Sequence, residues 1–209
     1  KNRWVILSGA LLAQFAIGAM YAWSLFNKPI SAAWGLLKDG GPSPQVVMTY
    51  AISLVCFSLA SIASGRLQLH KGPRFTALIG AALYTSGILL SSLATTPGML
   101  YLTYGVLAGS GVGFIYVCPL STLVKWFPKH KGGITGLATA AFAGGAIIFK
   151  EVISRLLQAD VYTPEVISST FLTLGITYGI MTFVGASLLD TPDDWEQQTK
   201  VSSTGGREY

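Results

Sequence analysis

The segment WVILSGALLAQFAIGAMYAWSLF, residues 4–26, decides the class of this protein. It contains no charged side chain, and a helix that crosses the hydrocarbon layer needs about 20 mostly apolar residues. Lys1 and Arg3 in front of it are typical of a signal peptide. However, the run is too long for the apolar part of a signal peptide, and no small-residue cleavage site closes it. We therefore expect a retained membrane-spanning helix.

The composition of the whole chain favours a bilayer as its solvent. Apolar residues make up 51% of the 209 residues and charged residues 11%, with a mean hydropathy of +0.55. A soluble domain carries about 25% charged residues. The net charge of +5 comes from scattered single residues, which argues against binding of nucleic acid. Cys56 and Cys118 lie in apolar runs without paired spacing, so we expect neither a disulfide nor a zinc site.

Five further apolar stretches give an all-α membrane protein with six transmembrane helices. Proline, glycine and charged residues separate the stretches. The predicted spans cover residues 4–26, 44–64, 75–94, 99–124, 134–156 and 166–189. Residues 1–189 would form one six-helix bundle, and the polar residues 190–209 a cytoplasmic linker.

The distribution of basic residues predicts the orientation of these spans. Alternate connections on one side carry Lys1, Arg3, Arg66, Lys71, Arg74, Lys125, Lys129 and Lys131. The opposite side has Lys28, Lys38 and Arg155, diluted by Asp39 and Asp160. By the positive-inside rule both ends are expected in the cytoplasm. The protein is therefore predicted to be a multi-pass protein of a bacterial inner membrane.

Polar side chains inside the predicted spans are the first candidates for a binding site. Gln14 and Tyr21 are seven residues apart and share one helical face, and Tyr116 lies in the middle of the fourth span. Such groups need partners in hydrocarbon, so they face protein or a water-filled path. Two readings stay open: contact with a ligand, or hydrogen bonds between helices.

Lys150 is the most informative single residue. It lies about 33 Å along a fifth helix that begins near Pro128, and no carboxylate stands three or four residues away. Glu151, in contrast, can pair with Arg155. The ammonium of Lys150 therefore extends to the outer surface, finds a distant partner, or meets an anionic ligand.

Enzymatic readings find no support in the sequence. His70 and His130 are the only histidines and fall in predicted loops, and no metal-ligand cluster or phosphate-binding loop is present. No cofactor is expected, and no selectivity-filter loop indicates a channel. Glu151 is the only acidic residue in the predicted spans, so this bundle offers no obvious proton site.

Closely spaced small residues and a weak internal repeat occur in the spans, and for the small residues two readings stay open: static packing, or contacts that let helices slide or rock. Gly105, Gly109 and Gly113 stand four apart, a spacing that lets helices pack closely in lipid. Gly18-Ala-Met-Tyr21 in the first span is similar to Gly113-Phe-Ile-Tyr116 in the fourth. Three spans per unit would give the halves opposite topology, a 3+3 inverted repeat found in many secondary transporters.

Three motifs resemble a known family. Residues 65–74, GRLQLHKGPR, resemble the loop signature of the major facilitator superfamily, matched by Gly65, Leu67, Gly72 and Arg74; Leu69 replaces the usual acidic residue. Residues 21–26, YAWSLF, and 124–133, VKWFPKHKGG, resemble the oxalate/formate antiporter family. Within it, the chain is similar to the bacterial pyruvate-inducible inner-membrane transporter branch.

This resemblance implies a twelve-helix carrier that works by alternating access, of which the chain supplies the N-terminal six-helix half. The implied partners are the lipid bilayer, a small carboxylate anion and a C-terminal six-helix half. In the family, aromatic residues of the N-terminal half surround the carboxylate. Tyr21 and Trp23 match that motif and Tyr116 matches it more loosely, whereas Gln14 and Lys150 come from the burial argument above.

Two alternatives to a carrier half remain at this point. One is a six-span sensor or assembly subunit that does not transport. The other is a six-helix unit that pairs with a second copy of itself to rebuild the two-fold architecture. Specific binding without flux would favour the first, and a dimeric mass in detergent the second.

Overall fold

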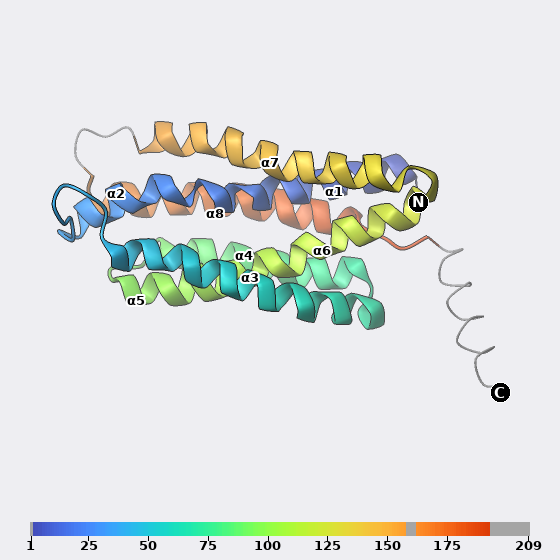
Figure 1. The fold of residues 1–209 in the computed structure, drawn as a ribbon, viewed down its shortest axis with the longest axis horizontal. Coiled ribbons are helices and arrows are strands. Elements are labelled where there is room, and N and C mark those ends of the chain that lie inside the picture. Colours follow the sequence, from blue (N-terminus) through green and yellow to red (C-terminus); the bar gives the residue numbers. More distant parts are fainter. Residues whose placement is uncertain (1, 158–161, 193–209) are drawn as a thin grey trace.

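Six long helical rods form one bundle in the computed structural model, which describes residues 2–157 and 162–192 (Figure 1). Within these residues, six helical segments are long and apolar enough to cross a membrane. This confirms the predicted all-α membrane architecture, and the chain is a multi-pass integral membrane protein. Most of the predicted linker, residues 193–209, and the predicted loop residue Asp160 lie outside the described residues.

The first span is continuous from Arg3 to Ala33 and has three parts. They are the helix α1 (Arg3–Gly18), the 3₁₀ segment η1 (Ala19–Trp23) and the helix α2 (Ser24–Ala33). The Asn2 side chain accepts a hydrogen bond from the Trp4 amide and caps the start. The helix runs past the predicted end at Phe26 because Pro29 does not stop it; the chain turns at Gly35, where φ is 64°.

The predicted loop of residues 65–74 is mostly helix, which corrects its placement. The second span, α3 (Pro44–Lys71), continues through Gly65 and Leu67, and the third, α4 (Pro73–Ser91), already includes Arg74. Only Gly72 lies between them, with φ of 83° in the region that favours glycine. No proline lies between Gly65 and Gly72, so α3 continues to Lys71, whereas Pro73 suits the first turn of the next helix.

The remaining spans begin at prolines. The fourth span joins α5 (Pro97–Leu100), the π-helical η2 (Tyr101–Ala108) and α6 (Gly109–Trp126). The fifth joins η3 (Pro128–His130) to α7 (Lys131–Leu156), and the sixth is α8 (Pro164–Leu188). Thr96 and Thr163 cap the fourth and sixth spans through their side-chain oxygens. Tyr104, near the start of the fourth span, is buried in the core.

Glycine sets the distance between particular pairs of helices. A Cβ at Gly109 or Gly113 would overlap main-chain atoms of Ser53 or Phe57 in α3. The predicted role in close packing is therefore confirmed for the glycines of the fourth span. By contrast, Gly132, Gly133 and Gly136 at the start of α7 have nothing within 4 Å of such a Cβ.

The packing of the bundle relates the first three spans to the last three. Gly18 in the first span lies against the main chain of Phe142 in α7, and Gly113 in the fourth lies against Phe57 in α3. The first span thus pairs with the fifth as the fourth pairs with the second. That correspondence is the one expected for a 3+3 inverted repeat.

The charged residues gather at the two ends of the rods. One end holds the start of α1, the turn at Gly72 and the connection around Phe127 (Figure 1). We call it the basic end; its described basic residues are Arg3, Arg66, His70, Lys71, Arg74, Lys125, Lys129, His130 and Lys131. The opposite end holds Lys28, Lys38, Asp39, Glu151, Arg155 and Glu165.

Candidate functional site

Tyr21 lies on the 3₁₀ segment η1, midway along the first span. Its side chain is 52% exposed on the bundle surface, an unusual position for a tyrosine far from a span end. The Tyr21 ring meets the edge of Phe142 in α7 at a centroid distance of 5.3 Å, and that of Tyr50 in α3 at 6.5 Å. A short 3₁₀ segment inside a long helix often marks a functional region.

Tyr116 continues the same set of rings from the fourth span. Its ring lies 5.3 Å from that of Phe142 and 5.5 Å from that of Phe57, both in edge-to-face geometry. These contacts form an unbroken row across the second, first, fifth and fourth spans. We call this row the aromatic chain; its members in order are Tyr50, Tyr21, Phe142, Tyr116 and Phe57.

Gln14 lies inside the bundle and contacts the aromatic chain through the main chain of Tyr116. Its side chain is fully buried, and Nε2 donates a hydrogen bond of 3.2 Å to the main-chain oxygen of Tyr116. The side-chain oxygen Oε1 is buried and has no hydrogen-bond partner within the described residues. A buried amide oxygen without a donor is costly and calls for a water or a ligand group.

Trp23 is separated from these three residues although it is close to Tyr21 in sequence. It is 2% exposed, and its ring packs on Tyr104 at 4.2 Å and on Phe26 at 5.8 Å. Its indole nitrogen Nε1 is buried without an acceptor among the described residues. Trp23, the last residue of η1, therefore belongs to the core and does not contribute its ring to the aromatic chain.

Lys150 lies on the surface of α7, about 12 Å beyond Phe142 along the helix axis. It is exposed, and no hydrogen bond or ion pair joins its side chain to another described residue. The neighbouring Glu151 does bind Arg155, with 2.8 Å between Oε1 and Nε, as the spacing predicts. Lys150 is thus not brought into the aromatic chain but stands between it and the end opposite the basic end.

The four residues of the family loop motif do not form a side-chain site. Gly65 and Leu67 lie in α3, Gly72 makes the turn, and Arg74 is exposed in the first turn of α4. A hydrogen bond of 2.7 Å from the Ser121 hydroxyl to the Gln68 side-chain oxygen joins α6 to α3 beside them. The motif therefore forms the junction of the second and third spans.

Three members of the aromatic chain were not foreseen from the sequence: Tyr50, Phe57 and Phe142. An apolar aromatic residue in a membrane span gives no signal of its own. The internal repeat relates two of them. Phe142 packs against Gly18 and Tyr21 of the first span, and Phe57 packs in the same way against Gly113 and Tyr116 of the fourth.

The chemistry of this face is that of hydrogen-bond donors and ring edges. Tyrosine hydroxyls and the Gln14 amide can donate, and the edges of aromatic rings carry partial positive charge. The described residues contain no group of three His, Cys, Asp or Glu side chains that could hold a metal ion. The face thus suits a small polar or anionic molecule rather than a metal.

Comparison with known proteins gives several relatives. The chain is 32% identical over 97% of its length to the uncharacterized MFS-type transporter YhjX of Escherichia coli (strain K12), covering 48% of that protein. It is 29% identical over 91% of its length to an oxalate:formate antiporter of Oxalobacter formigenes, covering 43%.

A third relative comes from a eukaryote. The chain is 33% identical, over 76% of its length, to apicoplast pyruvate carrier 1 of Toxoplasma gondii, and covers 36% of it. The chain spans about half the length, or less, of the curated relatives it matches. No family model matches the chain. These three relatives are named as a transporter, an antiporter and a carrier, and none is named as an enzyme.

Proposed function

The chain belongs to the major facilitator superfamily, and from that premise we propose that it forms one wall of the passage of a carboxylate carrier. The carrier moves small mono- or dicarboxylates, such as oxalate, formate, pyruvate or lactate, by alternating access. The observation that carries this proposal is the aromatic chain, because it places tyrosine hydroxyls from three spans, Tyr50, Tyr21 and Tyr116, along one row of rings that Phe142 of the fifth span joins.

The physical need for such a face follows from the substrate. A bare carboxylate is expelled from hydrocarbon, so a carrier must replace its hydration shell with donors and positive charge. Tyr21 and Tyr116 offer hydroxyls, and Gln14 holds the Tyr116 main chain from behind. Trp23, at the end of η1, packs against Tyr104 and so holds η1 in position. Lys150 supplies positive potential along the outer approach.

A second wall completes the passage in this proposal. It is a C-terminal six-helix half, or else a second copy of this bundle. Rocking of one wall against the other would alternate access to the site. The close contacts of Gly18 with α7 and of Gly113 with α3 favour movement of these span pairs as rigid units.

The charges at the rod ends support an orientation for the proposed carrier. The basic end would lie in the cytoplasm and the Lys150 end outside, in a bacterial inner membrane. Residues 190–209 would then form a cytoplasmic linker towards the second wall.

Transport assays test this function directly. The natural full-length protein, reconstituted in liposomes preloaded with one carboxylate, is expected to take up labelled oxalate, formate, pyruvate or lactate with saturation and trans-stimulation. Tyr21→Ala should lower uptake at least about tenfold, the effect of losing a hydrogen bond to a charged group. Phe75→Ala, an equally exposed aromatic residue at the start of α4, is the matched control.

Two results would contradict the proposal. If uptake of all four acids stays at the level of empty liposomes, small carboxylates are not the substrates. Specific binding of a carboxylate without any flux would instead identify a sensor.

A further inference from the structure

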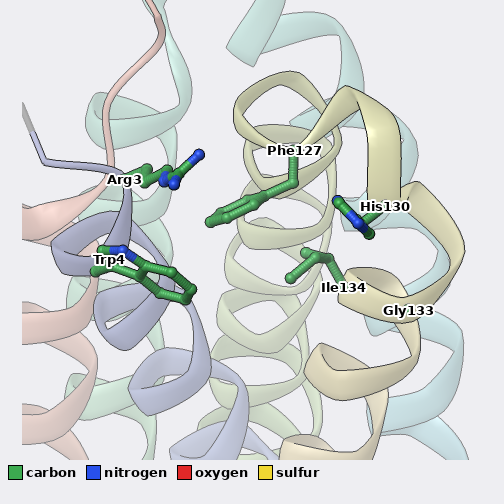
Figure 2. Close-up of a pocket in the computed structure, with 6 residues that line it drawn as sticks. All are labelled: Arg3, Trp4, Phe127, His130, Gly133 and Ile134. Atoms are coloured by element: carbon green, nitrogen blue, oxygen red, sulfur yellow. The ribbon is translucent and has the colours of Figure 1, made fainter.

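A pocket opens at the basic end, far from the aromatic chain. It lies between the start of α1 and the connection from α6 to α7 (Figure 2). Its volume is about 410 Å³, within the usual range of about 300–1,000 Å³ for ligand sites. The lining residues are Arg3, Trp4, Phe127, His130, Gly133 and Ile134.

The wall of the pocket is built from aromatic and aliphatic side chains. The ring centroids of Trp4 and Phe127 are 5.9 Å apart, with the ring planes tilted by 60°, and Ile134 lines the pocket from α7 (Figure 2). Gly133 contributes no side chain, and a Cβ there would meet nothing within 4 Å. Gly133 therefore does not serve a close approach of helices, and a larger side chain at this lining position has space to extend.

The rim of the pocket is cationic. The Arg3 guanidinium lies 5.5 Å above the Trp4 ring, and His130 stands across the pocket between Lys129 and Lys131 (Figure 2). Among the described residues, Asp190 is the only acidic one at the basic end, and its main-chain oxygen accepts a hydrogen bond from Trp126. The first turn of α7 contains no acidic residue.

We propose that this pocket binds an anionic phospholipid, with an acyl chain between Trp4, Phe127 and Ile134 and the headgroup phosphate at Arg3 and His130. The position favours a lipid because the pocket lies where the apolar spans end, at the depth of the headgroups. An apolar wall below a cationic rim matches the two parts of such a lipid. This site is separate from the aromatic chain and does not depend on the carboxylate proposal.

Native mass spectrometry of the natural full-length protein in detergent tests the proposal. The probes are dioleoyl phosphatidylglycerol and dioleoyl phosphatidylcholine, which share acyl chains and differ in net charge. The first phosphatidylglycerol should bind at about fivefold lower concentration than the first phosphatidylcholine. This is the effect expected from about one basic residue beside an anionic headgroup. Added salt should shrink this difference.

Matched variants separate the two parts of the site. Gly133→Leu should abolish the tight adduct by filling the pocket, while Gly132→Leu should leave it, because position 132 has equal free space but does not line the pocket. Arg3→Gln should remove the preference for phosphatidylglycerol. Arg74→Gln removes the same charge at the same end, outside the pocket, and should keep the preference.

Two outcomes would overturn the proposal. The first is equal binding of the two lipids by the unchanged protein. The second is an unchanged adduct in Gly133→Leu; if thermal stability falls at the same time, a protein segment and not a lipid occupies the pocket. Thermal unfolding of each variant in detergent verifies that it is folded, and a leucine in place of glycine favours the helix.

Discussion

The side chain of Gln14 in the first span donates a hydrogen bond to the main-chain oxygen of Tyr116 in the fourth. This bond joins the leading spans of the two repeat units at the aromatic chain. Of the two readings of Gln14 considered from the sequence, the hydrogen bond between helices is observed, and contact with a ligand stays a prediction. The side-chain nitrogen of Gln14 binds another helix, while its oxygen lacks a partner within the described residues. The free oxygen is the part available for a water that in turn contacts a ligand.

Gln14→Met tests whether this amide serves transport or packing. The substitution keeps the size of the side chain and removes both the donor and the unpaired oxygen, so the free energy of unfolding should change by less than about 1.5 kcal/mol. Transport kcat/KM should fall about tenfold in proteoliposomes. Ser121→Ala, which removes another hydrogen bond between spans, should leave transport intact. Reduced stability with normal transport would make Gln14 a packing residue only.

Gly18→Ala tests the close contact of the first and fifth spans. A Cβ at this position would overlap the Phe142 main chain, so the helices must separate, and the variant should lose about 1–3 kcal/mol of stability. Gly136→Ala in α7 is the control. Nothing surrounds a Cβ there, and the variant should gain roughly 0.5–1 kcal/mol from helix propensity. Thermal unfolding in detergent measures both, and equal shifts would refute the packing argument.

Helix existence and class were predictable from the sequence, whereas helix ends were less so. Apolar length alone fixed six spans, and prolines at positions 44, 73, 97 and 164 begin helices. The errors came from reading polar residues as loops. Residues 65–71 include Arg66, Gln68, His70 and Lys71 yet are helical, because no proline interrupts them before the turn at Gly72. The family predicted from three short motifs was confirmed by relatives that match nearly the whole chain.

The candidate site was only partly predictable. Gln14, Tyr21 and Tyr116 stand out as polar groups inside apolar runs, and the structure brings them together. Residues 21 and 23 are two apart and so point to opposite sides of a helix, but sequence position could not show that the side of Trp23 is the core and that of Tyr21 the surface. Nor could it show that Phe142 links both tyrosines, because that contact depends on how the fifth span crosses the first.

Lys150→Ala tests the electrostatic part of the carrier proposal. Loss of the ammonium should raise KM for the carboxylate about fivefold, with kcat and membrane expression little changed, because Lys150 acts along the approach and not at the aromatic chain. The control is Arg155→Ala on the same helix, whose charge is already paired with Glu151 and whose exposed pair contributes less than about 1 kcal/mol. An unchanged KM would leave extension of Lys150 to the membrane surface as its role.

Trp23→Phe separates support of η1 from contact with the substrate. The smaller ring leaves space beside Tyr104 and should cost about 1–3 kcal/mol of stability, while KM stays within about twofold of the unchanged protein. Thermal unfolding and uptake kinetics on the same preparation measure the two effects. A large rise in KM without loss of stability would place the indole in contact with the carboxylate.

Substrate protection at position 21 tests the central claim most directly. Tyr21→Cys is introduced into a full-length protein in which Cys56 and Cys118 are replaced by serine, and the rate of alkylation is measured with oxalate, formate, pyruvate or lactate present. At least one of these acids should slow alkylation severalfold, with a half-effect near its KM, while Phe75→Cys at the basic end reacts at a constant rate. Alkylation of Tyr21→Cys that none of the four acids changes would contradict a carboxylate site on this face.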